Sequence, residues 1–257
     1  MTAAQGRLNQ GVWDNVSDPL VAFLRGLALS AEDAAALAHG FGPPRALDRG
    51  EQLLREGDRP TALSVLCEGV AQAFRIVPAG GQQTLALFVP GDMLDACAFV
   101  LGTSDVAVCA ITPIKIMQIP HARLEQLIAA RPAIGRALWR RMTCDGAVLQ
   151  EWMVGLGRRT AYAQLAHLMC EVSVRMQAVG MASGESCKFP LTQSELADVL
   201  GLSTVHVNRI LQQLRGDGLI ELARGWLTIK DEERLVEAGG FDPSYLGSRG
   251  RAFEETA

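Results

Sequence analysis

The sequence contains few aromatic residues and no long apolar segment. Phe, Trp and Tyr make up 5% of the 257 residues, so an extended aromatic platform for stacking bases is not expected. The longest apolar runs, residues 96–101 and 106–111, contain six residues each, whereas a membrane-spanning helix needs about 20. Residues 1–14 lack the basic stretch and apolar run of a secretory signal peptide. We therefore expect a cytoplasmic protein without a membrane partner.

The chain also lacks an excess of positive charge. It has 24 Lys and Arg residues against 28 Asp and Glu residues, a formal net charge of −4. A nucleic-acid surface, if there is one, must therefore be a local patch. Charged residues make up 20% and apolar residues 49%, an ordinary globular composition. This length suits one large domain or two ordinary ones, and it needs no disulfide or metal to stabilise its core.

Recognisable metal and catalytic motifs are missing. No two of the six cysteines have CxxC spacing, and the four histidines are scattered. We expect reduced, mostly buried thiols, no metal site and no enzyme, because GxSxG, P-loop and HExxH motifs are absent. A thiol switch at Cys97, Cys109 or Cys144 is the alternative for the cysteines.

The periodicity of the first half changes from helical to β. Residues 17–39 have helical spacing, and glycine turns then recur every 11–12 residues between about residues 46 and 119. Short strands with evenly spaced turns predict a jelly-roll β-barrel. We assign residues 1–132 to this barrel domain and its N-terminal helices. The predicted class of the whole chain is α+β.

A long helix is predicted over residues 133–156. One line along it has alternating spacings of four and three residues, which is the pattern of a coiled-coil seam. This line consists of Leu138, Met142, Asp145, Leu149, Trp152 and Leu156. We predict a dimerisation helix, with an ordinary core helix as the alternative. Gly155 and Gly157 predict a hinge at its end.

Residues 157–239 are predicted to form a winged helix-turn-helix domain. Thr192 and Glu195 form a capping-box pattern, and Gly201-Leu202-Ser203 is a tight turn before a second helix. That helix is expected to bury Val205, Val207, Ile210, Leu211 and Leu214. A hairpin with Ala223-Arg224-Gly225 at its tip forms the wing. Residues 180–186 are expected to be a flexible linker, and residues 240–257 a flexible tail.

The second helix exposes hydrogen-bonding side chains with almost no carboxylate. The major groove of DNA admits one α-helix whose N-terminal residues face the base edges. Arg209 can read a guanine, and Arg224 at the wing can contact phosphate. The predicted DNA-binding residues are Thr192, Ser203, Thr204, His206, Asn208, Arg209, Gln212 and Arg224. The alternative is a ligand-binding signalling module whose winged helix is a protein–protein interface.

Three segments resemble the CRP/FNR family of bacterial transcription regulators. They are residues 191–220 (LTQSELADVLGLSTVHVNRILQQLRGDGLI), 157–172 (GRRTAYAQLAHLMCEV) and 88–94 (FVPGDML). The resemblance implies a cyclic-nucleotide-binding-type barrel, a dimer helix, a winged helix and a homodimer on near-palindromic double-stranded DNA. It also implies RNA polymerase as a partner.

The chain departs from the family pattern in the barrel. Asp95-Ala96 and Asp105-Val106 stand where cyclic-AMP sensors carry Gly-Glu and Arg-Ser or Arg-Thr. Because carboxylates repel a phosphate, cyclic AMP is not expected, and no cofactor is predicted. Haem, which some family members bind, is the alternative. An unknown effector, if one exists, would contact Leu87, Val89, Leu94, Phe99 and Leu149. In the second helix, Thr204-Val205 replace the Arg-Glu or Val-Glu of well-known members.

Overall fold

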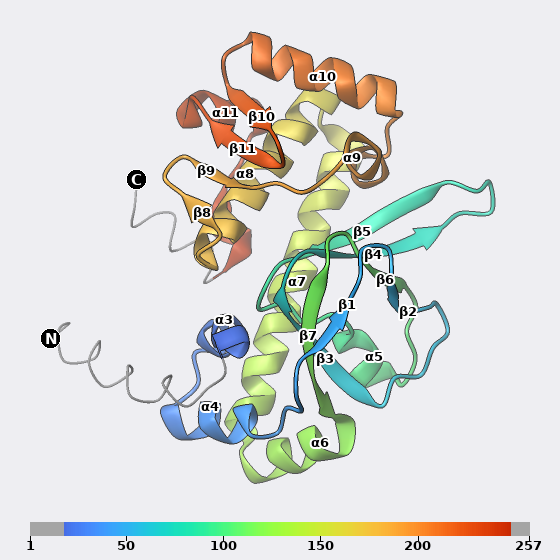
Figure 1. The fold of residues 1–257 in the computed structure, drawn as a ribbon, viewed down its shortest axis with the longest axis vertical. Helices are drawn as coiled ribbons and strands as arrows, with labels where there is room; N and C mark the ends of the chain where they lie inside the picture. The colour runs from blue at the N-terminus through green and yellow to red at the C-terminus, as the bar shows by residue number, and fades with distance from the viewer. Residues whose placement is uncertain (1–17, 248–257) are drawn as a thin grey trace, which may run out of the picture. The chain divides into compact units, whose positions relative to one another are not determined.

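The computed structural model describes residues 18–247 and shows a β-rich segment with helices before and after it (Figure 1). The chain divides into two units. The first contains Met1–Ala73 and Leu87–Thr143, and the second contains Phe74–Ala86 and Cys144–Ala257. The division therefore falls within the long helix α7, whereas the prediction set residues 133–156 apart as a segment of their own.

The first half of the chain contains short helices around two antiparallel sheets. The sheets have the strand orders β1-β7-β3 and β2-β6-β4-β5, which confirms the β-rich domain predicted from the turn spacing. The elements are α3 (Asp18–Leu27), α4 (Ala31–Ala38), β1 (Arg45–Leu47), β2 (Gln52–Leu54), β3 (Ala62–Glu68), β4 (Ala71–Ile76), β5 (Gln82–Phe88), α5 (Ala96–Leu101), β6 (Ala107–Ala110), β7 (Ile114–Pro120), α6 (His121–Ala130) and α7 (Pro132–Arg158).

The predicted turns are glycine turns in the structure. Gly69, between β3 and β4, has a φ of +84°, and a Cβ atom there would lie 2.4 Å from the backbone oxygen of Pro113. Only glycine fits such a position without a shift of the backbone. Strand β3, which precedes this turn, pairs with β7 from Ala62 opposite Pro120 to Glu68 opposite Lys115.

The core of the first unit lies between its helices and the β1-β7-β3 sheet. Apolar side chains of α3, α4, α6 and the start of α7 form one cluster with those of β3 and β7. Phe23, Ile119 and Ile134 in this cluster are fully buried. The helical periodicity at residues 17–39 is thus explained by one apolar face per helix.

The second half of the chain contains helices packed with a four-stranded sheet of order β10-β11-β9-β8. This arrangement confirms the C-terminal helix-turn-helix with its wing. The elements are α8 (Ala161–Ala178), β8 (Ala182–Ser183), β9 (Ser186–Lys188), α9 (Gln193–Leu200), α10 (Thr204–Gly216), β10 (Ile220–Ala223), β11 (Trp226–Ile229), α11 (Glu232–Gly239) and the 3-10 helix η1 (Pro243–Leu246).

Three local predictions in this half are wrong. Residues 180–186 are not a flexible linker, because they lead into the β8–β9 hairpin, whose strand β9 pairs with β11. Gly155 and Gly157 are not a hinge, because α7 continues to Arg158. The predicted tail is packed over residues 240–247, where Phe241 and Leu246 are buried. Residues 248–257 lie outside the described part.

The tip of the β4–β5 hairpin belongs to the second unit. Two hydrogen bonds explain this assignment. The side-chain amide of Gln82 donates to Asp198 over 3.2 Å, and that of Gln83 donates to the carbonyl of Val199 over 3.1 Å. Both acceptors lie on α9. Within residues 18–247, no helix is both long and apolar enough to cross a membrane.

Candidate nucleic-acid interface

The helix-turn-helix is built from local capping signals. The Thr192 hydroxyl accepts a hydrogen bond from the Glu195 backbone N–H over 3.2 Å, and the Glu195 carboxylate accepts one from the Thr192 N–H over 2.7 Å. Gly201, with a φ of +64°, ends α9. The Ser203 hydroxyl then caps α10 by accepting from the His206 N–H over 3.3 Å. The predicted capping box and turn are therefore confirmed.

One face of α10 is buried, and it is narrower than predicted. Val207, Ile210, Leu211 and Leu214 are at most 3% exposed. Val205 was expected among them, but its side chain is 81% exposed, so that prediction is wrong. Successive residues of an α-helix are rotated by about 100°, which puts Val205 opposite the centre of the buried face.

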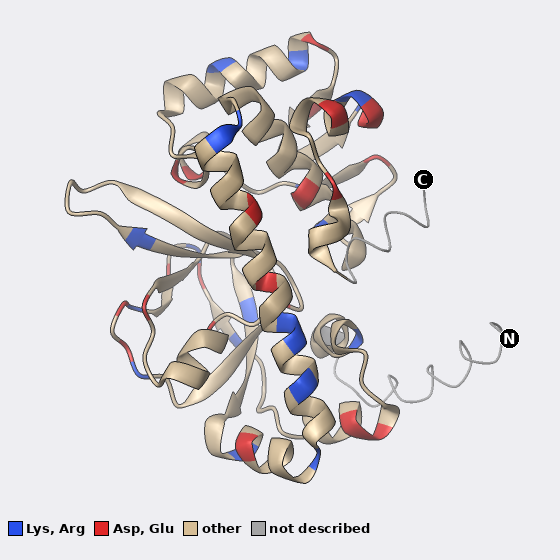
Figure 2. Cartoon of the chain, turned by 180° about the vertical axis from the view of Figure 1, so that it is seen from behind, with Lys and Arg blue, Asp and Glu red and all other residues tan. Residues whose placement is uncertain are grey.

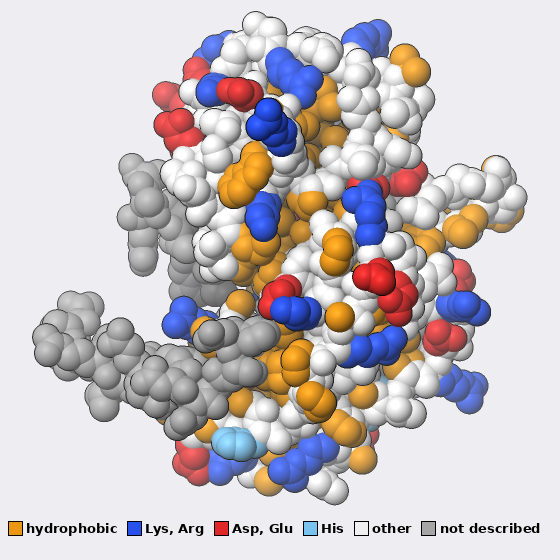
Figure 3. Space-filling model, viewed as in Figure 1, with side chains coloured by type: hydrophobic (Ala, Val, Ile, Leu, Met, Phe, Trp, Pro, Cys, Tyr) orange, Lys and Arg blue, Asp and Glu red, His pale blue; other side chains and the backbone are white. Residues whose placement is uncertain are grey.

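The opposite face of α10 carries a line formed by Val205, Arg209 and Gln212. Their spacings of four and three residues keep them on one side of the helix, and all three are exposed. No Asp or Glu occurs between Thr204 and Gly216, so acidic colour is absent from α10 (Figure 2). The side chains over α10 are mainly uncharged polar or basic (Figure 3).

The other predicted DNA-binding residues of the helix-turn-helix lie beside this line. Ser203 and Thr204 are exposed at the start of α10, whereas His206 is half-buried. Asn208 is exposed and donates to the Gln193 side-chain oxygen over 3.1 Å, which holds α10 against the start of α9. Thr192 is exposed at the N-terminus of α9. The residues thus surround two helix N-termini, where backbone N–H groups favour anions.

The wing is a tight hairpin with Arg224 at its tip. Ala223 pairs with Trp226, which leaves a two-residue loop with φ angles of +53° at Arg224 and +77° at Gly225. These positive angles are typical of a type I′ turn. The Arg215 guanidinium donates to the carbonyl of Leu222 over 2.9 Å, which links α10 to the wing.

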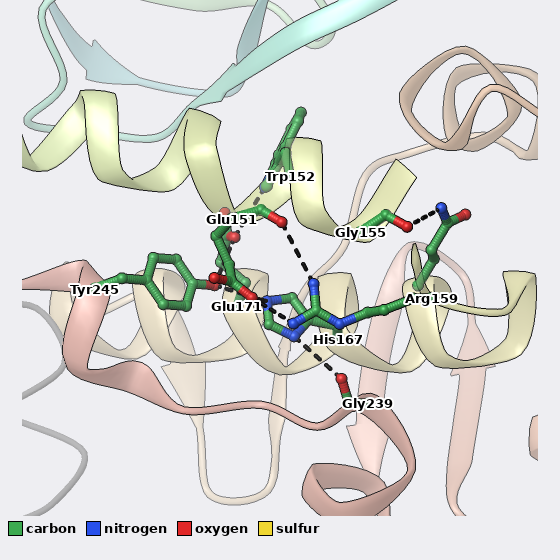
Figure 4. Close-up of polar contacts among 9 residues, drawn as sticks. Glu151, Trp152, Gly155, Arg159, His167, Glu171, Gly239 and Tyr245 are labelled. Carbon is green, nitrogen blue, oxygen red and sulfur yellow. Dashed lines mark hydrogen bonds and ion pairs between the residues drawn. The ribbon is translucent and has the colours of Figure 1, made fainter. Parts of the chain in front are cut away.

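A buried polar network centred on Glu171 lies in the same unit as α10 and the wing (Figure 4). Glu171 of α8 is 0% exposed. Its carboxylate accepts hydrogen bonds from the Trp152 indole over 2.9 Å, the Tyr245 hydroxyl over 2.8 Å and the Arg175 guanidinium over 3.0 Å. A buried carboxylate requires such partners. The network joins the end of α7, α8 and η1.

His167 and Arg159 extend the network. Burial, together with the positive charge of Arg159, lowers the pKa of His167. A ring nitrogen of His167 lies 3.2 Å from the Gly239 carbonyl, and the other lies 3.0 Å from the Tyr245 hydroxyl. Arg159 donates to Glu151. A cavity of about 30 Å³ beside these residues has room for one or two water molecules.

The exposed side of α7 carries an apolar stripe that differs from the predicted seam. Leu138 is 6% exposed and belongs to the core cluster of its own unit, so its predicted place in a dimer interface is wrong. Trp152 is half-buried and bonded to Glu171, and Asp145 is half-buried. If each of these three residues is exchanged for the residue that follows it in the chain, the line becomes an apolar stripe. The stripe consists of Trp139, Met142, Gly146, Leu149, Met153 and Leu156. All of them are exposed except Met142, which is half-buried.

The residues predicted to contact an effector differ in burial, and they do not all belong to the same unit. Leu87, Val89 and Leu94 are buried, and Phe99 is partly buried against the core of the first unit. Leu149 is 48% exposed and belongs to the second unit. The effector site stays a prediction.

The two departures from the cyclic-AMP pattern have different environments. Asp95 is 5% exposed, and its carboxylate accepts hydrogen bonds from the backbone and the hydroxyl of Ser64 over 2.7 and 2.8 Å. Burial raises the pKa of Asp95 to about 6. Asp105 is exposed. Asp92 forms a buried ion pair with Arg141 of α7, which ties the turn after β5 to that helix.

The six cysteine thiols differ in burial. Cys67, Cys170 and Cys187 are buried, Cys109 and Cys144 are half-buried, and Cys97 is exposed. Burial raises the pKa of the Cys67 and Cys170 thiols to about 12, so both stay protonated and unreactive. In residues 18–247, no group of three or more His, Cys, Asp and Glu side chains could hold a metal ion.

Comparison with known proteins matches both halves of the chain. Residues 163–238 match the model of the Crp-like helix-turn-helix domain, and residues 44–131 match that of the cyclic nucleotide-binding domain. The transcriptional activator protein anr of Pseudomonas aeruginosa is 27% identical over 83% of this chain and 87% of its own length. FnrL of Cereibacter sphaeroides, also a transcriptional activator protein, is 27% identical over 77% and 81%.

A solved structure has the same fold. FixK2 from Bradyrhizobium japonicum superimposes with a TM-score of 0.68 and 20% identity, over 76% of this chain and 96% of FixK2.

Proposed function

The chain belongs to the CRP/FNR family of transcription regulators, and we propose that it acts as a homodimer that binds a near-palindromic DNA site. The line of Val205, Arg209 and Gln212 carries this proposal, because it is exposed and lies beside no carboxylate of α10. A guanidinium so placed can form two hydrogen bonds to a guanine in the major groove. We propose that the chain performs this role in the cytoplasm.

The stripe on α7 supports the dimer. Its apolar residues alternate by three and four positions, the spacing at which two helices pack side by side. Gly146 in the middle of the stripe has no side chain, so it allows close approach of the partner helix. Exposed apolar residues in a row also mark a contact surface rather than a solvated face.

We propose that the barrel senses an effector other than cyclic AMP, or none. Asp95 would hold a negative charge above a pH of about 6, and a carboxylate near a phosphate is repulsive. RNA polymerase is the further partner that the family suggests. A signalling module whose winged helix binds protein is the competing proposal.

Gel shifts at several salt concentrations test DNA binding. The DNA is a site selected from random duplexes, compared with a scrambled sequence. Arg209→Ala should lose about 1–3 kcal/mol on the selected site and little on the scrambled one, because Arg209 contacts a base. Arg224→Ala should weaken binding to both DNAs alike and reduce the salt slope by about one, because it contacts phosphate.

The comparison of the two variants decides between the proposals. Equal losses on both DNAs would refute base reading by Arg209. If no duplex is selected, or neither variant loses affinity, the winged helix does not read DNA and the protein-interface proposal gains.

A further inference from the structure

Val205 is an apolar side chain placed where the fold gives it no partner. It is the second residue of α10 and is 81% exposed. A β-branched residue is a poor choice for the first turn of an exposed helix. An acidic residue would stabilise that turn through the helix dipole, yet the first turn of α10 contains none. Stability of the protein alone does not explain Val205.

The position of Val205 relative to Arg209 is fixed by the helix. Four residues of an α-helix rise about 6 Å, and successive bases along one strand are about 3.4 Å apart. Both side chains lie on the side opposite the buried residues Val207 and Leu211. A helix lying in the major groove therefore places Val205 within about two base pairs of the guanine that Arg209 would contact.

The chemistry of base edges leaves one good partner for a valine. Thymine is the only one of the four bases that presents a methyl group in the major groove, whereas guanine, adenine and cytosine are recognised there through their hydrogen-bonding groups. Valine can neither donate nor accept a hydrogen bond, so a polar edge opposite it would lose its water without compensation. Contact with a methyl group buries apolar surface on both sides.

We propose that Val205 is a specificity-determining residue that packs on the C5-methyl group of a thymine, within two base pairs of the guanine contacted by Arg209. The inference rests on the proposed DNA-binding function and names the base that this function selects beside the guanine. Val205, in the first turn of α10, would recognise its base by shape and apolar contact, whereas Arg209 would recognise its base by hydrogen bonds.

The test replaces single thymines in the selected site by deoxyuridine, which lacks only the methyl group. Affinity is measured by fluorescence anisotropy with the full chain. At one thymine in each half-site, near the guanine identified with Arg209→Ala, wild-type protein should bind about fourfold more weakly, the effect of burying about one methyl group. Deoxyuridine at the other thymines is the control within the DNA.

Matched protein variants identify the residue that senses the methyl group. Val205→Ala should bind the thymine and deoxyuridine sites equally, because its shorter side chain no longer reaches the base. Gln212→Ala, on the same exposed line, should keep the fourfold difference. A further pair of DNAs carries cytosine or 5-methylcytosine at the position of this thymine. Wild-type protein should bind the 5-methylcytosine site more tightly than the cytosine site, because the methyl group is restored.

Each result bears on the inference. A thymine effect that disappears in Val205→Ala and persists in Gln212→Ala supports it. An effect that persists in Val205→Ala, or no deoxyuridine effect at any thymine of a site that still needs Arg209, overturns it while the proposed function stands. Failure to select any site overturns both.

Discussion

The buried carboxyl group of Asp95 makes the stability of the barrel unit depend on pH. Its hydrogen-bond donors, the backbone and hydroxyl of Ser64, are neutral, and burial raises its pKa from 3.8 to about 6. The folded protein therefore keeps a proton that the unfolded chain releases at a lower pH. This contribution to stability is fully present below a pH of about 4 and is lost as the pH rises to about 6.

Urea unfolding of the wild type and of Asp95→Asn between pH 4 and 7.5 tests this prediction. The amide keeps the shape and one acceptor of the carboxyl group but does not titrate. Relative to the variant, the wild type should lose up to about 3 kcal/mol of unfolding free energy across this range. A difference that stays constant with pH would show that Asp95 keeps an ordinary pKa.

Gly239 is required by the packing of α11 on α8. A Cβ atom at this position would lie 2.6 Å from the backbone nitrogen and 2.9 Å from the Cα atom of His167. Because backbone atoms cannot turn aside, Gly239→Ala should destabilise the protein by about 1–3 kcal/mol, the usual range for overpacking. Thermal unfolding followed by circular dichroism measures the change.

Gly216→Ala is the matched control for this substitution. Gly216 is helical, and nothing lies within 4 Å of the added Cβ atom. Alanine should therefore leave stability unchanged or raise it by up to about 1 kcal/mol. If both variants melt like the wild type, the close approach of the two helices is incorrect.

At the scale of elements, α7 offers a sharp test of the apolar stripe. Met153 and Val154 are adjacent and similarly exposed, at 66% and 50%, but they differ by about 100° around the helix. Met153→Asp should give monomers, because it places a carboxylate in the partner contact. Val154→Asp should remain dimeric. Light scattering at micromolar concentration distinguishes the two.

The opposite result for these two variants would identify a different contact line on α7. Monomers from Val154→Asp and dimers from Met153→Asp would place the contact on the neighbouring side of α7. Dimers from both would remove this helix from the interface.

The sequence predicts the existence of α7 well but not which of its sides is buried within the chain itself. Apolar residues on this helix serve two surfaces, and the four-and-three spacing fits both. Leu138 completes its own core, and Trp152 donates to the buried Glu171. These contacts come from residues far away in the chain, so no local pattern reports them.

Local signals explain the accuracy at the helix-turn-helix. Thr192 with Glu195, Gly201 and Ser203 are caps and stops that act within a few residues. The β8–β9 hairpin and residues 240–247 depend instead on pairing with β11 and on contacts with α8. Val205 could have been found from the sequence, since 100° steps already place it opposite Val207 and Leu211.

At the scale of the whole molecule, the proposed dimer would combine the α7 stripe with two copies of the α10 surface on one DNA site. In a two-fold dimer each protomer presents one copy of α10, and the second half of α7 is joined to α8 by the Glu171 network. In the proposed dimer, this connection would set the distance between the two copies of α10. Their half-sites should then be inverted repeats whose centres are about one helical turn of DNA apart.

Changing the distance between the half-sites tests this arrangement. Inserting five base pairs at the centre of the selected site rotates one half-site by about half a turn, so the two copies of α10 can no longer enter both grooves. Affinity should fall at least about tenfold, toward that of nonspecific DNA. Hydroxyl-radical footprints should show two protected half-sites on the original duplex and none on the altered one. Unchanged affinity after the insertion would mean that each protomer binds its half-site independently.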